Sequence, residues 1–184
     1  MNSKPSLTRR HFIKRAGLVY VATNALLARP AAANIDRRPR SLRFLHTHTG
    51  ESLSTQYFDG VTFDVASLRN IDFLLRDFRT GETHVMDPAL LDILYDLQEL
   101  ADHEAPFEVI SGFRSPGTNE MLRGKSLGVA EHSQHILGKA IDVRLSGYST
   151  DRLRDHARTL ARGGVGYYAS SDFIHLDTSR VRFW

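Results

Sequence analysis

Residues 133–145 read SQHILGKAIDVRL, and this stretch holds the clearest local signal in the chain. Its second half alternates apolar and charged side chains: Ile141, Asp142, Val143, Arg144 and Leu145. Alternation with a period of two is typical of a β-strand that buries one face. The stretch therefore predicts a strand over residues 140–145 that follows a polar loop.

The chain on both sides of this stretch mixes strands and helices. Short apolar runs predict further strands over residues 41–45, 52–58, 107–110, 165–168 and 173–178. Apolar residues at helical spacing predict helices that begin at Asp64, at Asp87-Pro88 and at Thr150. We expect Gly163-Gly164 to end the last helix. Because the elements do not alternate regularly, the sequence predicts an α+β fold.

The first 33 residues have the order of segments found in an export signal. Residues 8–14 read TRRHFIK, a twin-arginine pattern, and residues 16–28 form a mostly apolar stretch. Three alanines that end at Ala33 offer a small-residue cleavage site. This order predicts recognition by the twin-arginine translocase during export, and hence a periplasmic location.

The first 33 residues also bear on membrane anchoring and on the domain boundaries. Its apolar stretch is too short to span a bilayer comfortably, and the absence of cysteine excludes a lipid-anchor site, so we expect no membrane anchor. Residues 34–40 are basic and polar and contain Pro39, which is typical of a linker. The sequence therefore predicts an export signal over residues 1–33, a linker over 34–40 and one domain over 41–184.

Removal of the signal reverses the sign of the net charge. The whole chain carries 24 basic and 21 acidic residues. Six of the basic residues lie in residues 1–33, which leaves 18 basic against 21 acidic residues and a formal net charge of −3. A binder of nucleic acid needs a basic surplus for the phosphates, so we exclude nucleic acid as a partner. The absence of cysteine also excludes disulfides and thiolate metal ligands.

Three residues have the side-chain types of a metal site. His135 lies in the polar loop seven residues before Asp142, and His175 lies in the apolar stretch FIHLD. A catalytic zinc site takes three nitrogen or oxygen ligands and leaves a fourth position for water. A polar group inside an apolar strand is costly to bury unless it is hydrogen-bonded or metal-bound. Each residue taken alone also has an ordinary explanation, as a loop histidine, a hydrogen-bonded strand carboxylate or a core histidine. The spacing therefore indicates only a possible metal site.

Several separated motifs are shared with a known family. In chain order they are HTGE at 48–51, SGFRSP at 111–116, SQHILGKAIDVR at 133–144, GVGYY at 164–168, FIHLDT at 173–178 and RVRFW at 180–184. Together they closely resemble the murein endopeptidase K-like zinc peptidases, which belong with the D-Ala-D-Ala carboxypeptidases. The resemblance implies the Hedgehog/D-Ala-D-Ala-peptidase fold, a small antiparallel sheet flanked by helices, over essentially all of the chain after the signal.

The resemblance also implies roles for individual residues. It implies a zinc enzyme that acts on peptidoglycan stem peptides or their cross-links, with His135, Asp142 and His175 as the zinc ligands. Arg114, in the SGFRSP loop, is implied to bind and polarise the substrate, as a fixed cation near a developing oxyanion would. The pattern does not require the remaining histidines near these motifs, so we do not expect His46, His48 or His132 to be ligands.

Two carboxylates are candidates for the general base, and of the two we favour Asp172. Asp172 lies three positions before His175, where the carboxypeptidase branch has an acid. Asp177 belongs to the FIHLDT motif and shares a strand face with His175, so it is a candidate either for the base or for a partner that orients this ligand. Ile174 replaces the aromatic residue that often precedes the last ligand in the carboxypeptidases, which argues against simple carboxypeptidase specificity.

The sequence thus predicts a zinc-dependent murein endopeptidase that hydrolyses peptide cross-links of peptidoglycan. Two alternatives stay open at this point. One is a D,D-carboxypeptidase that trims stem peptides, and the other is a catalytically silent zinc-containing module that binds wall peptide. The type of cross-link, 4→3 or 3→3, is also open.

Overall fold

A computed structural model of the protein describes residues 37–125 and 128–184. The predicted export signal over residues 1–33 lies outside the described residues, as do residues 34–36 of the predicted linker. No helix within the described ranges combines the length and the apolar character that crossing a membrane requires.

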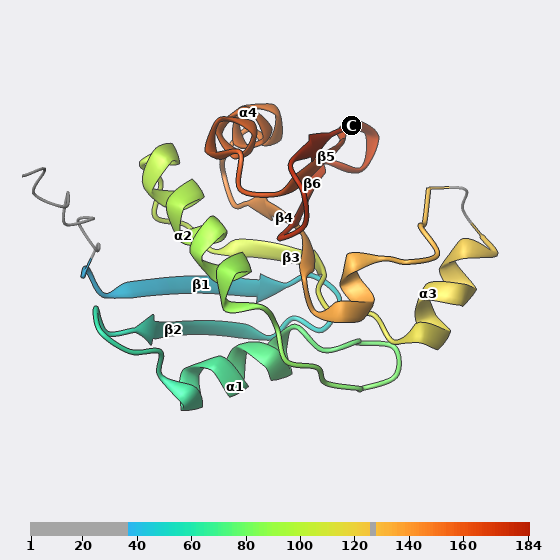
Figure 1. Ribbon diagram of the computed structural model, residues 1–184, viewed down its shortest axis with the longest axis horizontal. Helices are drawn as coiled ribbons and strands as arrows, with labels where there is room; N and C mark the ends of the chain where they lie inside the picture. Colours follow the sequence, from blue (N-terminus) through green and yellow to red (C-terminus); the bar gives the residue numbers. More distant parts are fainter. Residues whose placement is uncertain (1–36, 126–127) are drawn as a thin grey trace, which may run out of the picture. The chain divides into compact units, whose positions relative to one another are not determined.

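Seven strands form one mixed sheet (Figure 1). They are β1 (Arg40–His46), β2 (Ser52–Phe58), β3 (Phe107–Ser111), β4 (Ala140–Leu145), β5 (Gly164–Tyr168), β6 (Phe173–Asp177) and β7 (Arg182–Phe183). Their order across the sheet is β2-β1-β3-β4-β6-β5-β7. The predicted α+β class is confirmed, but the sheet is not purely antiparallel, because β1 pairs with β3 and β5 pairs with β7 in parallel. The parallel β1–β3 pair arises because two helices separate β2 from β3 and return the chain to the same end of the sheet.

Within the described residues, four α-helices accompany the sheet: α1 (Val65–Leu74), α2 (Pro88–Ala101), α3 (Pro116–Arg123) and α4 (Thr150–Leu160). Two short 3-10 helices, η1 (Gln134–Leu137) and η2 (Ala169–Ser171), lie close to the motifs described above. The carboxylates of Asp64 and Asp87 accept hydrogen bonds from backbone N–H groups in the first turns of α1 and α2, as predicted.

The predicted ends of α4 are wrong by one residue at the start and by several at the end. Ser149 occupies the capping position, and Thr150 is the first helical residue. The helix stops at Leu160 because Ala161 adopts the left-handed conformation, and Gly164 already belongs to β5. The sequence analysis also missed α3, whose start has the Ser-Pro pattern of a capped helix.

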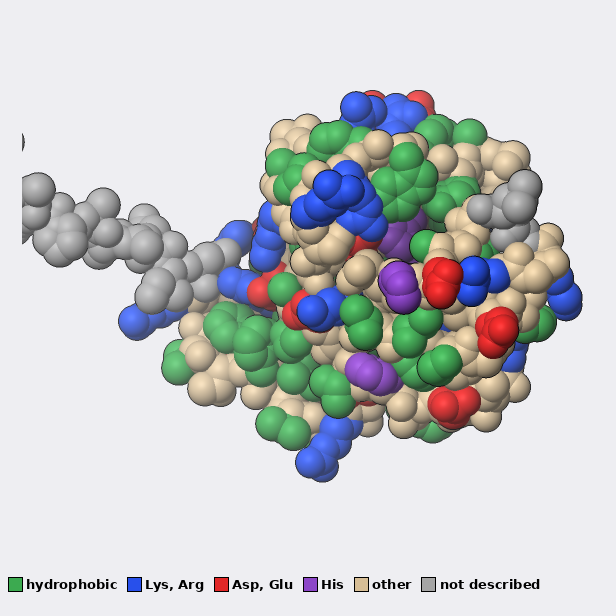
Figure 2. Space-filling view, turned by 45° about the vertical axis from the view of Figure 1, so that its right-hand side comes forward, with side chains coloured by type: hydrophobic (Ala, Val, Ile, Leu, Met, Phe, Trp, Pro, Cys, Tyr) green, Lys and Arg blue, Asp and Glu red, His purple; other side chains and the backbone are tan. Residues whose placement is uncertain are grey.

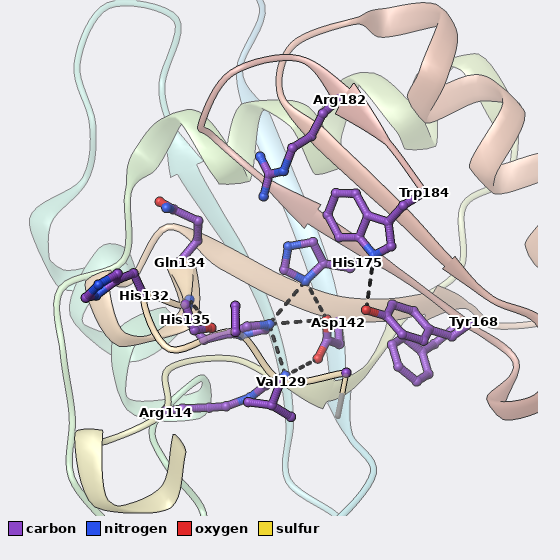
Figure 3. Close-up of a pocket in the computed structure, with 14 residues that line it drawn as sticks. Arg114, Val129, His132, Gln134, His135, Asp142, Tyr168, His175, Arg182 and Trp184 are labelled. Carbon is purple, nitrogen blue, oxygen red and sulfur yellow. Dashed lines mark hydrogen bonds and ion pairs between the residues drawn. The ribbon is translucent and has the colours of Figure 1, made fainter. Parts of the chain in front are cut away.

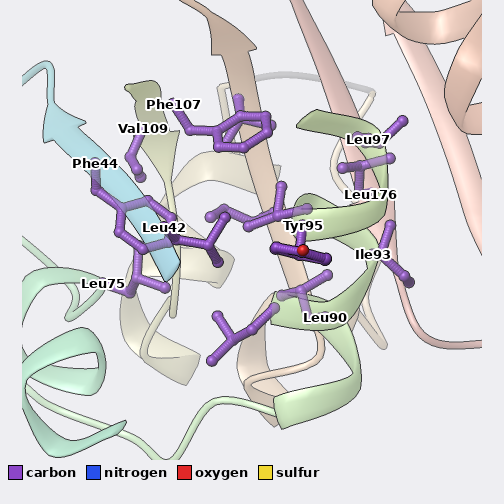
Figure 4. Packing of buried hydrophobic residues seen from close by; sticks show 14 of the residues in the cluster. Leu42, Phe44, Leu75, Leu90, Ile93, Tyr95, Leu97, Phe107, Val109 and Leu176 are labelled. Atoms are coloured by element: carbon purple, nitrogen blue, oxygen red, sulfur yellow. The ribbon is translucent and has the colours of Figure 1, made fainter. Parts of the chain in front are cut away.

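The core lies on one face of the sheet, where α2 packs against the strands (Figure 4). Its contributors are fully or almost fully buried and include Leu42, Phe44, Leu90, Leu94, Leu97, Phe107 and Val109. The other face of the central strands is polar: Glu108 and Arg144 are cross-strand partners, and Arg144 Nε donates to Glu108 Oε2 at 2.8 Å. Asp142 lies two residues before Arg144 on β4 and therefore shares this polar face.

Gly112 connects β3 to the loop that reaches the polar face. The backbone passes so close to the end of α1 that a Cβ at Gly112 would lie 2.4 Å from the carbonyl oxygen of Leu75. Phe113 N donates to the same carbonyl oxygen at 2.8 Å. The absence of a side chain at this position therefore fixes where the following loop, which contains Arg114, begins.

We expect Gly112→Ala to destabilise the protein by about 1–3 kcal/mol, because the added methyl group would displace backbone rather than a flexible side chain. Gly117→Ala is the matched control, since a Cβ there would meet nothing within 4 Å and the position is helical. The control should be neutral or stabilising by up to about 1 kcal/mol. Denaturant unfolding of both variants measures the difference, and equal stability would show that the contact with Leu75 imposes no constraint.

Candidate metal centre

The three predicted ligands meet on the polar face of the sheet (Figure 3). Asp142 on β4 and His175 on β6 are direct cross-strand partners, and His135 comes from η1, just before β4. All three side chains are buried. In the part of the chain that the structure describes, they form the one cluster of three such side chains whose ligand atoms lie within 4.8 Å of one another.

The spacing of the ligand atoms suits a small divalent metal ion. His135 Nε2 lies 3.2 Å from His175 Nδ1 and 3.2 Å from Asp142 Oδ1. His175 Nδ1 lies 2.8 Å from Asp142 Oδ1. A tetrahedral ion with bonds of about 2.0–2.2 Å separates its ligand atoms by roughly 3.3–3.6 Å. The three side chains therefore already stand near the positions that such an ion requires.

The outer nitrogen of each imidazole is held by an acceptor. His135 Nδ1 donates to the carbonyl oxygen of Gly112 at 2.7 Å, and His175 Nε2 donates to Asp177 Oδ2 at 3.0 Å. These bonds leave His135 Nε2 and His175 Nδ1 as the ring nitrogens that face Asp142. Acceptors behind the ligating rings are typical of protein metal sites. The donor set and its supporting hydrogen bonds thus fit a bound metal.

The charge states of His135 and Asp142 suit ligands, whereas the raised pKa of His175 favours a ring proton that a bound metal would have to displace. Burial lowers the pKa of His135, which keeps this imidazole neutral. Burial would raise the pKa of Asp142, but the adjacent imidazoles of His135 and His175 outweigh it and hold that pKa well below its usual range. The carboxylate is therefore ionised although its residue is only 4% exposed. Burial opposes protonation of His175, yet hydrogen bonds to Asp142 and Asp177 raise its pKa overall.

Arg114 reaches the ligand atoms from the loop between β3 and α3. Its Nη2 lies 3.0 Å from His135 Nε2 and forms an ion pair with Asp142 Oδ2, while its Nε donates to Ser111 Oγ at 2.9 Å. A nitrogen lone pair that accepts a hydrogen bond from a guanidinium cannot bind a metal at the same time. Arg114 and a metal ion are therefore alternatives at His135, and the arginine lies beside the metal-binding atoms in either case.

Asp177 lies behind His175. Its buried carboxylate accepts the His175 hydrogen bond and also two from Arg182, at 2.7 Å to Oδ2 and 3.1 Å to Oδ1. Burial would raise the pKa of Asp177, but hydrogen bonds from His175, Ser179 and Arg182 keep it far below the usual range. The contact with His175 Nε2 is the one expected of a residue that orients this predicted ligand.

Asp172, the other predicted base, is not brought to the ligands. It lies in a left-handed turn with φ 51°, one residue before β6 begins, so it does not take part in the alternation that places His175 and Asp177 on the polar face. Its exposed carboxylate accepts a hydrogen bond from Thr150 Oγ1 at 2.6 Å and lies 3.5 Å from Arg144 Nη1. The geometry therefore gives no support to the expectation of a base at this position.

Two glycines of β5 make room for the site, and the sequence analysis did not identify them. Gly164 lies opposite Asp177 and Gly166 lies opposite His175. A Cβ at Gly164 would lie 2.5 Å from Asp177 Oδ2, and one at Gly166 would lie 2.6 Å from the Trp184 ring. The period of two in GVGYY was the available signal, because it places both glycines on the face that carries the ligands.

A cavity of about 480 Å³ lies over the ligand atoms. Tyr168 and Trp184 lie on one side of it and His132 and Gln134 on the other (Figure 3). Trp184 Nε1 donates to the Tyr168 hydroxyl at 3.2 Å. Figure 2 shows histidine side chains on this face of the molecule, one of them set back in a hollow beneath basic and hydrophobic groups. The cavity is large enough for a short peptide segment.

Comparisons with known proteins place the chain in a family. The family model described as peptidoglycan L,D-endopeptidase MepK matches residues 34–184. The chain belongs to this family. The probable peptidoglycan L,D-endopeptidase MepK of Haemophilus influenzae is 46% identical over 148 residues, which are 80% of this chain and 80% of the relative. The peptidoglycan L,D-endopeptidases MepK of Escherichia coli K12 and of Shigella flexneri are each 39% identical over 177 residues, which are 96% of both chains.

Membership in the MepK family confirms the resemblance found in the motifs, and with it the predicted enzyme class, a metallopeptidase. His46, His48 and His132, which we did not expect to be ligands, lie outside the cluster of His135, Asp142 and His175. His132 lines the cavity, whereas His46 ends β1 and His48 belongs to the connection between β1 and β2. Glu51, next to them, pairs with Arg76 at 2.8 Å.

We expect Asp177→Asn to weaken zinc binding by about 10–100-fold, because the amide is a poorer acceptor for His175 and loses the ion pair with Arg182. Asp172→Asn makes the same chemical change just outside the site and should leave the affinity unchanged. Competition with a chromophoric chelator measures both affinities. An equal loss in the two variants would show that Asp177 has no special part in holding His175.

Proposed function

We propose that the chain is a zinc-dependent murein endopeptidase that hydrolyses peptide cross-links of peptidoglycan in the periplasm. One observation carries the proposal: a buried His-Asp-His cluster, with both imidazoles oriented by acceptors, lies under a peptide-sized cavity in a chain of the MepK family. The relatives named above are peptidoglycan L,D-endopeptidases, which supports a wall cross-link as the substrate.

The three ligands differ in what they contribute. His135 and His175 offer neutral nitrogen donors, and Asp142 supplies a negative charge that offsets half of the charge of a divalent ion. Bound zinc would supply Lewis acidity, which polarises a carbonyl and lowers the pKa of a water molecule. Asp177 keeps His175 in the tautomer that can bind, and therefore acts through this ligand rather than on the substrate.

Arg114 is the group that we assign to the substrate. A metal ion held by His135 Nε2 would take the lone pair that the Arg114 guanidinium contacts here, and N–H donors of Arg114 would then be free beside the ligands. A planar cation held by Ser111 is suited to donate hydrogen bonds to the oxygen of the scissile carbonyl as negative charge develops there. We therefore propose that Arg114 binds the substrate and stabilises the transition state.

The base that accepts the proton of the attacking water must lie within hydrogen-bond reach of it. Both oxygens of Asp177 are already engaged by His175 and Arg182, so we propose that this residue positions the ligand. Asp172 would reach the site only after leaving Thr150 and Arg144. We therefore expect Asp172→Asn at saturating zinc to keep its turnover within about threefold of wild type, whereas loss of a true base costs about 10²–10⁴-fold.

Arg114→Ala should retain zinc but lose about 10²–10³-fold in kcat, because it removes a donor to the developing oxyanion. The assay is mass spectrometry of the muropeptides released from purified sacculi by the zinc-loaded protein without its signal. Asp142→Ala, which loses a metal ligand, sets the inactive baseline. Release of monomers derived from cross-links would support the endopeptidase. Release of terminal D-Ala alone would indicate a D,D-carboxypeptidase. If no product forms, the remaining reading is a module that binds wall peptide without cleaving it.

We also propose export by the twin-arginine pathway, with residues 1–33 as the signal, residues 34–40 as a linker and residues 41–184 as the peptidase domain. The support is the TRRHFIK pattern and the alanines up to Ala33. Replacement of Arg9 and Arg10 by lysine should leave unprocessed precursor in the cytoplasm, as fractionation and immunoblotting would reveal. Normal appearance of the processed variant in the periplasm would exclude this route.

A further inference from the structure

The cleft over the metal ligands continues beyond Arg114. A second cavity of about 190 Å³ shares Arg114 and Asp142 with the first, and also Val129 and Phe173. Its remaining walls come from His48, Arg79, Ile110, Ser111 and Leu122. The two cavities therefore adjoin at Asp142 and Arg114, and a peptide whose scissile bond is held there would extend into both.

Three arginines line the two cavities, and they differ in their partners. Arg114 pairs with Asp142, and Arg182 pairs with Asp177. The guanidinium of Arg79 lies over the ring of Phe78, 4.1 Å from its centroid, and among the described residues it has no carboxylate within ion-pair distance. Arg79 thus brings an uncompensated positive charge to the second cavity.

The turn that carries Arg79 is fixed to the loop that carries Arg114. The carboxylate of Asp77, whose residue is 1% exposed, accepts hydrogen bonds from Arg79 N at 3.0 Å and from Ser115 N at 2.9 Å. It also accepts one from Ser115 Oγ at 2.8 Å. Because Ser115 directly follows Arg114, one buried carboxylate sets the positions of both arginines relative to each other.

His48 completes this side of the second cavity. Its ring stacks on Phe78 with a centroid distance of 4.2 Å and an interplanar angle of 14°. The imidazole and the guanidinium of Arg79 are therefore both supported by one aromatic ring and both line the same cavity. Donors held in place before binding lose less conformational entropy when a ligand arrives.

We propose that Arg79, with His48 on the wall of the same cavity, binds a carboxylate of the substrate, namely the one on the carbon that bears the leaving nitrogen. The proposal rests on the proposed function. In an L,D cross-link to the amine of a diamino acid, the D centre that supplies this amine keeps its own free carboxylate. With the scissile carbonyl at Arg114 and the metal, that carboxylate lies only one carbon beyond the bond and enters the adjoining cavity. A guanidinium suits a carboxylate because it can donate two parallel hydrogen bonds.

The first cavity is a poorer place for this carboxylate. Its additional arginine, Arg182, is already neutralised by both oxygens of Asp177. The aromatic rings of Tyr168, Phe173 and Trp184 suit the apolar parts of the acyl side of the substrate better than a charge. The negative charge of Asp142, which borders both cavities, is offset by Arg114 and by the two imidazoles.

The test compares two L,D-cross-linked muropeptides that differ only in this carboxylate, which is free in one and amidated in the other. Zinc-loaded wild-type protein should prefer the free carboxylate by about 10–100-fold in kcat/KM, the range expected for a charge-assisted hydrogen bond. Arg79→Ala should bring the ratio close to one, mainly through a raised KM for the peptide with the free carboxylate. Arg79→Lys should keep part of the preference.

Arg152→Ala is the matched control. Arg152 is also an exposed arginine over an aromatic ring, 5.1 Å from the centroid of Tyr148, but it does not line the cleft. Its substitution should leave the ratio as in wild type. Equal wild-type rates on the two peptides, or an unchanged ratio in Arg79→Ala, would overturn the assignment of this carboxylate site while the endopeptidase function stands. Failure of wild-type protein to cleave either peptide would overturn both.

Discussion

The site depends on the cross-strand pairing of Asp142 with His175. Their backbones are direct partners on β4 and β6, and their side chains meet at 2.8 Å on the polar face of the sheet. Neighbouring strands are held at a fixed separation by their ladder of hydrogen bonds. Two of the three ligands are therefore positioned by the sheet itself, and only His135 has to be added from a short helical turn.

Further contacts hold this pair and the third predicted ligand in place. Asp177 lies two residues after His175 on the same face, and Arg182 of β7 holds Asp177 in turn. Gly112 accepts the hydrogen bond of His135 with its carbonyl group and at the same time starts the loop of Arg114. A single close approach of backbone to Leu75 thus positions both a predicted metal ligand and the arginine that we assign to the substrate.

Parts of this arrangement could be predicted from the sequence because they are local. The alternation in β4 and the caps at Asp64 and Asp87 depend on neighbours within a few residues.

The set of His135, Asp142 and His175 came from the resemblance, since its spacing alone was ambiguous. Asp172 looked equivalent to an acid of related enzymes, but a left-handed turn directs the chain differently there. β7 was missed because it has only two residues and depends on pairing with β5. Nothing in the sequence separates Arg79 from the paired arginines, because pairing is a property of the folded chain.

The two glycines of β5 restrict how such a site can change. Beside His175 and Asp177 the sheet has no space for even one added methyl group, because Trp184 and the Asp177–Arg182 pair fill it. A substitution in this strand would therefore disturb the metal ligands before it altered any contact with a substrate. The turns that carry His48 and Arg79, and the segment with His132 and Gln134, face the cavities without contributing a metal ligand. New substrate preferences in this architecture have to arise in those loops, while the strands beneath them remain as they are.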